Sequence, residues 1–438
     1  MLEILIIIIY SALFCIFIAK TSLFKVKDLS LLFICMAFFI KIGVGILYGY
    51  LHHFYFAGGD TIDYFNSAEQ ISSTFFKYPS YYFRSWFWMN PEMPDNSVFY
   101  YPEWSFIKKD FGTYLLVHVH ALPQLLCFGY YNVHIVFVAL LSLLSSLNFY
   151  RALRDTINLP KSFLIFSCFF MPSVLFWTAG LHKDVWVYFG FSLLMLSLRK
   201  LVLHKKIAIP ELFSGIIIIA LFRYYLILLI FPALLAIMWS VLNLKKSPLF
   251  KFIVAYSVFL TIMLLVELLG IFPIMELLSS RQHEFLSETG NSGIAGAQEL
   301  RPTFLSMLSQ LPYAIINVCF RPFIWDCNDL LQYVAAFEII IFWFFVIVSL
   351  PYRRTDKAAN SMSYFLFFYS VTNLLLIGML VCNVGTIVRY RSIALSMLFV
   401  VVMQAFDYIK LGIRKRQLNK PSSVKRSNNN SAAINSNL

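Results

Sequence analysis

The sequence predicts an all-α polytopic transmembrane helix bundle of about eleven spans, with two long outward loops that contain short interfacial helices. Of the 438 residues, 60% are hydrophobic and only 13% are charged, whereas soluble domains carry roughly 25% charge. Mean hydropathy is +0.74. Apolar runs of about 18 residues or more recur along the chain, and each is long enough to cross a bilayer as a helix.

The predicted spans follow these apolar runs in order. The first run lacks the basic start and the small-residue cleavage site of a signal peptide, so we interpret it as a retained helix. Residues 1–408 form one transmembrane domain, and the Asn- and Ser-rich residues 409–438 form a cytoplasmic, disordered tail. The spans lie near residues 2–19, 29–50, 131–150, 163–180, 184–201, 207–222, 224–242, 250–273, 331–350, 362–383 and 388–408.

Basic residues orient the predicted bundle. Clusters of Lys and Arg follow every odd-numbered span, at residues 20–27, 151–161, 199–206, 245–251, 353–357 and 410–416. Because such clusters accumulate on the cytoplasmic side, we expect the amino terminus outside and the carboxyl terminus in the cytoplasm. The loops 51–130 and 274–330 then face outward. The net charge of +13 is scattered among these connections, which argues against nucleic-acid binding.

The first outward loop opens with two candidate catalytic acids in the segment FYFAGGDTIDYFN. Gly58 and Gly59 allow a turn as the chain leaves the membrane. If a helix starts there, Asp60 and Asp63 lie one turn apart on the same face, where they suit a general base and a ligand to metal or phosphate. The structural alternative is that Asp60 caps the helix and Asp63 interacts with its positive end.

The rest of this loop is rich in aromatic residues. Tyr and Trp at an interface commonly anchor a protein in the membrane. Aromatic faces beside carboxylates also suit sugar rings, which makes Tyr64, Glu103 and Trp104 candidate contacts for a sugar or an acceptor. His118 and His120 are two residues apart and point to opposite sides of a helix, so we do not expect them to hold a metal.

Six basic side chains fall on the outward ends of spans, against the topology trend. His182 and Lys183 occupy the tip of the hairpin PSVLFWTAGLHKD. Lys183 could simply pair with Asp184, but both residues would also suit an anionic lipid headgroup. Arginine binds phosphate bidentately, so a phosphate on a lipid carrier is the expected ligand unless the arginines neutralise the acids of the outward loops. The four outward arginines are Arg223, Arg321, Arg389 and Arg391.

These segments resemble polytopic GT-C glycosyltransferases, which use a polyprenyl-phosphate-linked sugar and an acid in the first outward loop. The resemblance rests on the Gly-Gly-Asp start of that loop, on GTYLLVHVHALPQLLCFGYYN, on the PSVLFWTAGLHKD hairpin and on the late RYR. It covers residues 50–200 well. It implies that Asp60 or Asp63 is the catalytic acid and that Lys183 and the outward arginines contact the lipid phosphate. One feature departs from the family pattern, in which the acidic loop follows the first span: here an additional helix precedes it, so the loop follows the second span.

We therefore expect an enzyme that transfers a sugar from a polyprenyl-phosphate donor to a glycan or lipid-linked acceptor, in cell-surface polysaccharide or glycoconjugate synthesis. It would work at the outer face of a bacterial inner membrane. A divalent cation, Mg²⁺ or Mn²⁺, could assist, with Asp60 or Asp63 as a ligand. One alternative is a polysaccharide polymerase that joins lipid-linked oligosaccharides. Another is a transporter or flippase, although Lys41 and Glu267 are the only charges expected inside the membrane and no repeat is found.

Overall fold

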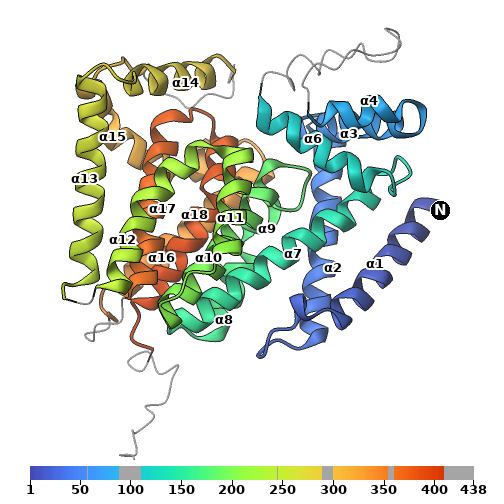
Figure 1. The fold of residues 1–438 in the computed structure, drawn as a ribbon, viewed down its shortest axis with the longest axis horizontal. Coiled ribbons are helices and arrows are strands. Elements are labelled where there is room, and N and C mark those ends of the chain that lie inside the picture. The colour runs from blue at the N-terminus through green and yellow to red at the C-terminus, as the bar shows by residue number, and fades with distance from the viewer. Residues whose placement is uncertain (57, 88–109, 244, 289–298, 354–359, 409–438) are drawn as a thin grey trace, which may run out of the picture.

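The computed structural model describes the chain except for residues 57, 88–109, 244, 289–298, 354–359 and 409–438. The described residues are predominantly helical and contain no β-strand (Figure 1). This agrees with the predicted all-α bundle. The predicted contacts Glu103 and Trp104, and the tail 409–438, lie outside the described residues.

Nine helices among the described residues are long and apolar enough to cross a membrane. They coincide with nine of the predicted spans, and a π-helical turn, Leu51–Tyr55, extends the second of them. The nine are α1 (Leu2–Lys20), α2 (Leu31–Tyr50), α7 (Tyr131–Thr156), α10 (Lys183–His204), α12 (Tyr225–Leu242), α13 (Pro248–Leu268), α16 (Leu330–Ser349), α17 (Ser361–Leu380) and α18 (Val384–Gln404).

The other two predicted spans correspond to shorter helices. The fourth predicted span is divided into α8 (Lys161–Ile165), a π-helical turn (Phe166–Phe170) and α9 (Pro172–Trp177). The break falls before Pro172, which has no backbone N–H to continue the helix. The sixth is α11 (Ile209–Arg223), whose 15 residues are fewer than the roughly 20 that cross a bilayer.

The two predicted outward loops also contain helices. Residues 51–130 form α3 (Asp60–Lys77), α4 (Pro79–Ser85) and α6 (Phe111–Gln124). Residues 274–330 form α14 (Ile274–Glu288), α15 (Phe304–Cys319) and a short 3₁₀ turn (Ile324–Asp326). Helices α3, α4 and α14 lie at the upper end of the bundle in Figure 1. A 3₁₀ turn, Ser22–Phe24, follows α1 at the lower end.

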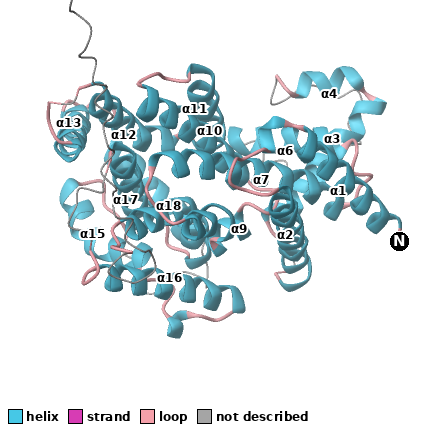
Figure 2. Cartoon of the chain, turned by 90° about the horizontal axis from the view of Figure 1, so that it is seen from below, coloured by secondary structure: helices cyan, strands magenta, loops and turns pink. Residues whose placement is uncertain are grey.

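Close helix packing holds the bundle together. Helix α10 packs against α7 and α11, and α17 packs against α15 and α18. A Cβ on Gly215 of α11 would lie 2.7 Å from the carbonyl oxygen of Gly190, and one on Gly378 of α17 would lie 2.2 Å from that of Ala314. Small residues allow such approach between membrane helices. Figure 2 shows α1–α4 on one side and α12, α13, α15 and α17 on the other, with α7, α9 and α10 between them.

The lower end of the bundle collects basic connections. Arg154 lies 3.3 Å from Asp28 and 2.7 Å from Asp155, and Arg199 Nε donates to Asp155 at 2.6 Å. The Asn360 amide bonds the carbonyl of Thr156. The connections after α1, α7 and α10, and the start of α17, therefore meet at one end of the molecule.

Candidate functional site

A buried carboxylate, Asp184, lies where three helices meet near the upper end of the bundle. Its Oδ1 accepts from Arg223 Nη2 at 2.6 Å, and its Oδ2 accepts from Arg389 Nε at 2.6 Å. The Asp184 side chain is only 4% exposed. It stands in the first turn of α10, where the helix dipole also favours a negative charge. The N-terminus of α10 is thereby joined to the end of α11 and the start of α18.

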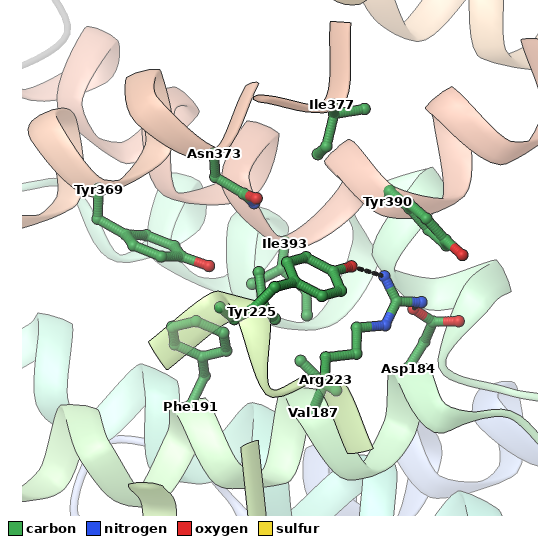
Figure 3. A pocket seen from close by; sticks show the side chains of 11 residues that line it. Asp184, Val187, Phe191, Arg223, Tyr225, Tyr369, Asn373, Ile377, Tyr390 and Ile393 are labelled. Carbon is green, nitrogen blue, oxygen red and sulfur yellow. Dashed lines mark hydrogen bonds and ion pairs between the residues drawn. The ribbon is translucent and has the colours of Figure 1, made fainter. Parts of the chain in front are cut away.

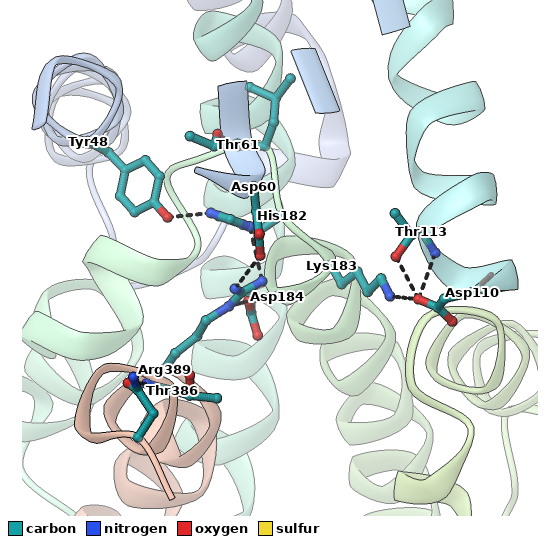
Figure 4. A network of polar contacts seen from close by, with 12 residues as sticks. Tyr48, Asp60, Thr61, Asp110, Thr113, His182, Lys183, Asp184, Thr386 and Arg389 are labelled. Atoms are coloured by element: carbon teal, nitrogen blue, oxygen red, sulfur yellow. Dashed lines mark hydrogen bonds and ion pairs between the residues drawn. The ribbon is translucent and has the colours of Figure 1, made fainter. Parts of the chain in front are cut away.

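Arg389 extends this ion pair toward the surface. Its Nη1 donates to Asp60 Oδ2 at 3.2 Å, and its Nη2 lies 3.0 Å from Nδ1 of His182 (Figure 4). All three guanidinium nitrogens are therefore engaged. The side chain of Arg389 is 15% exposed, whereas that of Asp60 is 47% exposed. The ion-paired residues Asp60, Asp184, Arg223 and Arg389 form the Asp184 cluster. Asp60 is the carboxylate of this cluster that a substrate can reach.

The start of α3 places Asp60 in this position. Gly58 and Gly59 have φ of +132° and +125°, angles that residues with a Cβ rarely adopt. The N-cap of α3 is Gly59, and Asp60 is its first residue, so the expectation that Asp60 caps the helix is wrong. Asp63 lies in the same first turn. Asp60 contacts Arg389 directly, through the bond from Nη1.

Lys183 pairs with Asp110 and not with its neighbour Asp184, in contrast to the structural alternative above. Successive residues on a helix point about 100° apart, which separates the two side chains. Asp110 also caps α6, since its carboxylate accepts from the backbone N–H and the hydroxyl of Thr113, at 3.2 and 2.6 Å. Burial alone would raise the pKa of Asp110, but the bonds from Lys183 and Thr113 lower it below its ordinary value.

Arg223 borders a small pocket on the inner side of the cluster (Figure 3). Its guanidinium carbon lies 4.0 Å from the ring centre of Tyr390, and its Nη1 donates to the Tyr225 hydroxyl at 3.2 Å. Asn373 also lines the pocket, and among the described residues its buried Oδ1 has no hydrogen-bond partner. Polar groups from α11, α12 and α17 therefore face the pocket from more than one side. Its other lining residues are Asp184, Val187, Phe191, Leu226, Tyr369, Ile377 and Ile393.

Arg391 and Arg321 belong to a different part of the molecule. Arg391 is fully buried, and its Nη1 donates to the carbonyls of Val318, at 3.0 Å, and of Arg321. Arg321 Nε lies 3.7 Å from Asp326. These contacts are with the end of α15 and the turn that follows it, and not with Asp60 or Asp184. The sequence grouped four outward arginines, and the structure brings only Arg223 and Arg389 together.

Tyr64 lies beside the cluster, as a sugar contact would, but its side chain is buried. It is 4% exposed, and its ring stands edge-on to that of His182 with centroids 6.0 Å apart. Burial raises the pKa of the Tyr64 hydroxyl above its usual range. The Tyr64 side chain therefore packs on the buried side of the site, next to His182.

His118 and His120 enter separate hydrogen-bond systems, as their spacing predicts. His118 Nε2 lies 3.1 Å from the Ser85 hydroxyl. His120 Nδ1 lies 2.9 Å from His134 Nε2, and Trp186 Nε1 donates to His120 Nε2 at 3.2 Å. Burial lowers the pKa of His118 to about 4 and that of His120 to about 3. Both are neutral groups that fasten α6 to its neighbours.

The buried charges differ from those expected. Lys41 is buried, and its Nζ donates to the Ser142 hydroxyl at 2.9 Å. Glu267 is only half-buried. Glu338 of α16 is buried instead and accepts from the backbone N–H of Ser173 at 2.9 Å. The span interiors therefore hold more ionisable groups than the sequence indicated.

The residues of the site do not form a divalent cation site. Asp60 and Asp184 both face the guanidinium of Arg389, which already supplies a positive charge between them. Within the described residues, no group of three or more His, Cys, Asp and Glu side chains could hold a metal ion.

The charges of the site balance. Three cations face three carboxylates, and only two of the carboxylates are substantially exposed. If the exposed Asp60 took up a proton, Arg389 would lose one of its two anionic partners and could stabilise a new negative charge nearby. The six residues are Arg223, Arg389, Lys183, Asp60, Asp110 and Asp184.

The sequence does not identify Asp184, Asp110 or Tyr48 as residues of this site. From the sequence, Asp184 is expected only as a partner for Lys183, although outward arginines need carboxylates to neutralise them. The hydroxyl of Tyr48 contacts His182 Nε2. Nothing in the sequence indicates this role, because a tyrosine inside an apolar run is common.

In comparisons with known proteins, no family model, no curated protein and no solved structure matches the chain.

Proposed function

We propose that the chain is a membrane glycosyltransferase that moves a sugar from a polyprenyl-phosphate donor to a glycan or lipid-linked acceptor. The observation that supports it best is the pairing of a half-exposed carboxylate, Asp60, with Arg389, which is itself anchored by the buried Asp184. A base and a phosphate-binding cation are thereby adjacent. Sugar transfer from a lipid phosphate needs both.

The proposed reaction uses these groups in one displacement. Asp60 takes the proton of an acceptor hydroxyl, whose oxygen forms a bond to the anomeric carbon of the donor sugar. The bond from that carbon to the phosphate oxygen breaks, and the electron pair leaves with the lipid phosphate. Arg389, now released from the neutral Asp60, stabilises the charge that develops on the phosphate. Lys183, at the rim of the site, is placed to hold the phosphate in the donor.

The location of the site suits a substrate held in a bilayer. Helices α10 and α18 are candidate membrane spans and begin at the cluster, while Asp60 starts a helix of the first long loop. The reacting groups therefore lie where span ends meet the loops that charge topology predicts to face outward. We propose that this end faces the outside of a bacterial inner membrane.

The test is sugar transfer by the purified protein in lipid nanodiscs. Asp60→Asn should reduce transfer by about 10²- to 10⁴-fold, the usual contribution of a general base. The matched control is Asp63→Asn, in the same helical turn, which should retain more activity. Full activity in Asp60→Asn at normal expression would show that the assigned base is wrong.

A second candidate is a transporter or flippase for the same lipid-linked anion. It is favoured by buried ionisable side chains within candidate spans, among them Lys41, Asp184, Glu338 and Arg391. Vesicle assays separate the two: an enzyme forms a new glycosidic bond, whereas a flippase moves an intact labelled lipid between leaflets. The polymerase alternative predicts loss of activity on Arg389→Ala and Arg391→Ala but not on either aspartate change.

A further inference from the structure

His182 lies between α9 and α10 with both ring nitrogens in contact with other groups. Its side chain is 1% exposed. Nε2 contacts the Tyr48 hydroxyl, and Nδ1 lies 3.0 Å from Nη2 of Arg389 (Figure 4). The histidine therefore links α2 to α18 at the base of the charged cluster.

The partners of the ring determine which nitrogen carries the proton. A guanidinium has five N–H donors and no acceptor, so the nitrogen facing Arg389 must accept. Neutral imidazole has one donor and one acceptor nitrogen. Nδ1 therefore holds the lone pair, Nε2 carries the hydrogen, and Nε2–H donates to the oxygen of Tyr48. The opposite tautomer would place an N–H of His182 against an N–H of Arg389.

The surroundings also oppose a second proton on this ring. Protonation of Nδ1 would remove the acceptor of Arg389 and place a cation beside it. Burial, and then the charge of Arg389, lower the pKa of His182 well below its ordinary value. The anions Asp60 and Asp184 are both bonded to Arg389 instead. The other ionisable groups facing His182 are Arg223, His52, Tyr48, Tyr64 and His120.

We propose that His182 is a neutral positioning residue, which carries its proton on Nε2 and presents the Nδ1 lone pair to Arg389. It fixes the third nitrogen of a guanidinium whose other two bind Asp60 and Asp184. His182 is then neither the phosphate ligand that the sequence indicated nor a proton carrier. Its assigned tautomer is independent of the proposed function, whereas its effect on catalysis rests on that function.

The tautomer can be read by ¹⁵N NMR of the full-length protein with ring-labelled histidine. The His182 signals are assigned by their absence from His182→Asn. Across about pH 5 to 8, where free histidine changes charge, Nδ1 should keep the shift of a bare nitrogen and Nε2 that of an N–H. Free labelled histidine in the same buffer provides the reference. A cationic ring in this range, or a proton on Nδ1, would overturn the proposal.

A kinetic comparison tests the positioning role. Asn at residue 182 keeps a side-chain oxygen that can accept from Arg389, whereas Leu removes both bonds. His182→Asn should retain at least about tenfold more transfer activity than His182→Leu, with an unchanged pH–rate profile. Loss of one limb of the profile in His182→Asn would mean that the ring transfers protons. If no transfer is found with the wild-type protein, the proposed function fails, and the NMR result still decides the tautomer.

Discussion

Arg389 and Arg391 stand two residues apart on α18 and lie in opposite environments. Arg389 is bound by two carboxylates and is partly exposed, whereas Arg391 is fully buried and bonds two backbone carbonyls near the end of α15. Two residues on a helix differ by about 200° in direction, which explains the separation. A short basic motif on a helix can therefore supply arginines to two separate parts of the molecule.

The two arginines also differ in how well they are satisfied. All three nitrogens of the Arg389 guanidinium have partners, but in the described part of the chain Nε and Nη2 of Arg391 have none. Arg391 thus loses the free energy of hydration without full compensation. We interpret Arg389 as the functional arginine and Arg391 as a structural link between α18 and α15.

The largest expected effect is on catalysis and follows from Arg389→Ala. Transfer should fall by about 10²- to 10³-fold, because the charge that faces the departing phosphate is lost. The measurement is initial rate in nanodiscs at matched protein concentration. Folding should survive, since Arg223 still neutralises Asp184.

The matched control for this change is Arg391→Ala. It leaves the carbonyls of Val318 and Arg321 without their donor, which costs about 1–3 kcal/mol for each buried group. Its activity per folded molecule should remain near wild type. If instead Arg391→Ala abolished transfer in a fully folded protein, the division of roles between the two arginines would be wrong.

A smaller effect, on stability, is expected from Asp184→Asn. This change leaves Arg223 and Arg389 close together and without a shared anion, so it should destabilise the fold by about 3–5 kcal/mol. Detergent-based denaturation with a fluorescence readout measures the loss. Asp60→Asn is the control, because a half-exposed pair contributes under about 1 kcal/mol. Equal stability of the two variants would contradict the central role of Asp184.

The smallest effect is on the pH dependence of stability and concerns the ion pair of Lys183 with Asp110. The folded pKa of Asp110 is lowered, so its contribution to stability is present above its ordinary pKa and is lost as pH falls through the folded value. Below about pH 4, Asp110→Asn should therefore lose stability less steeply than wild type. Lys183→Met should also make the loss of stability less steep, since it removes the cation that lowers the pKa of Asp110. Identical slopes in all three proteins would exclude the predicted linkage.

Much of the fold could be predicted because membrane crossing is a local property of the sequence. Nine apolar runs became nine long helices, since each run satisfies its own backbone hydrogen bonds. The division of the fourth span was less visible, although Pro172 marks its position. The sequence also predicts a full span at the short helix α11, because the apolar residues continue into α12 after Arg223.

The candidate site was only partly predictable. The Gly-Gly-Asp turn identified Asp60, since two glycines before an acid at the end of a span are a local signal. Arg223 and Arg389 were also found, because charges at these span ends have no topological reason. The partner that joins them was missed. Which carboxylate meets which arginine depends on the directions of α10, α11 and α18, and not on any single segment.

The helical membrane architecture, the basic connections at one end and the acid at the start of α3 could be derived from local sequence. Each depends on composition within about 20 residues or on one turn of backbone. The pairing of Asp184 with two arginines, the turn of Lys183 to Asp110 and the separation of Arg391 from the site follow only from how the helices pack. A buried charge is stabilised by the partners that packing brings within about 3 Å, and these come from distant parts of the chain.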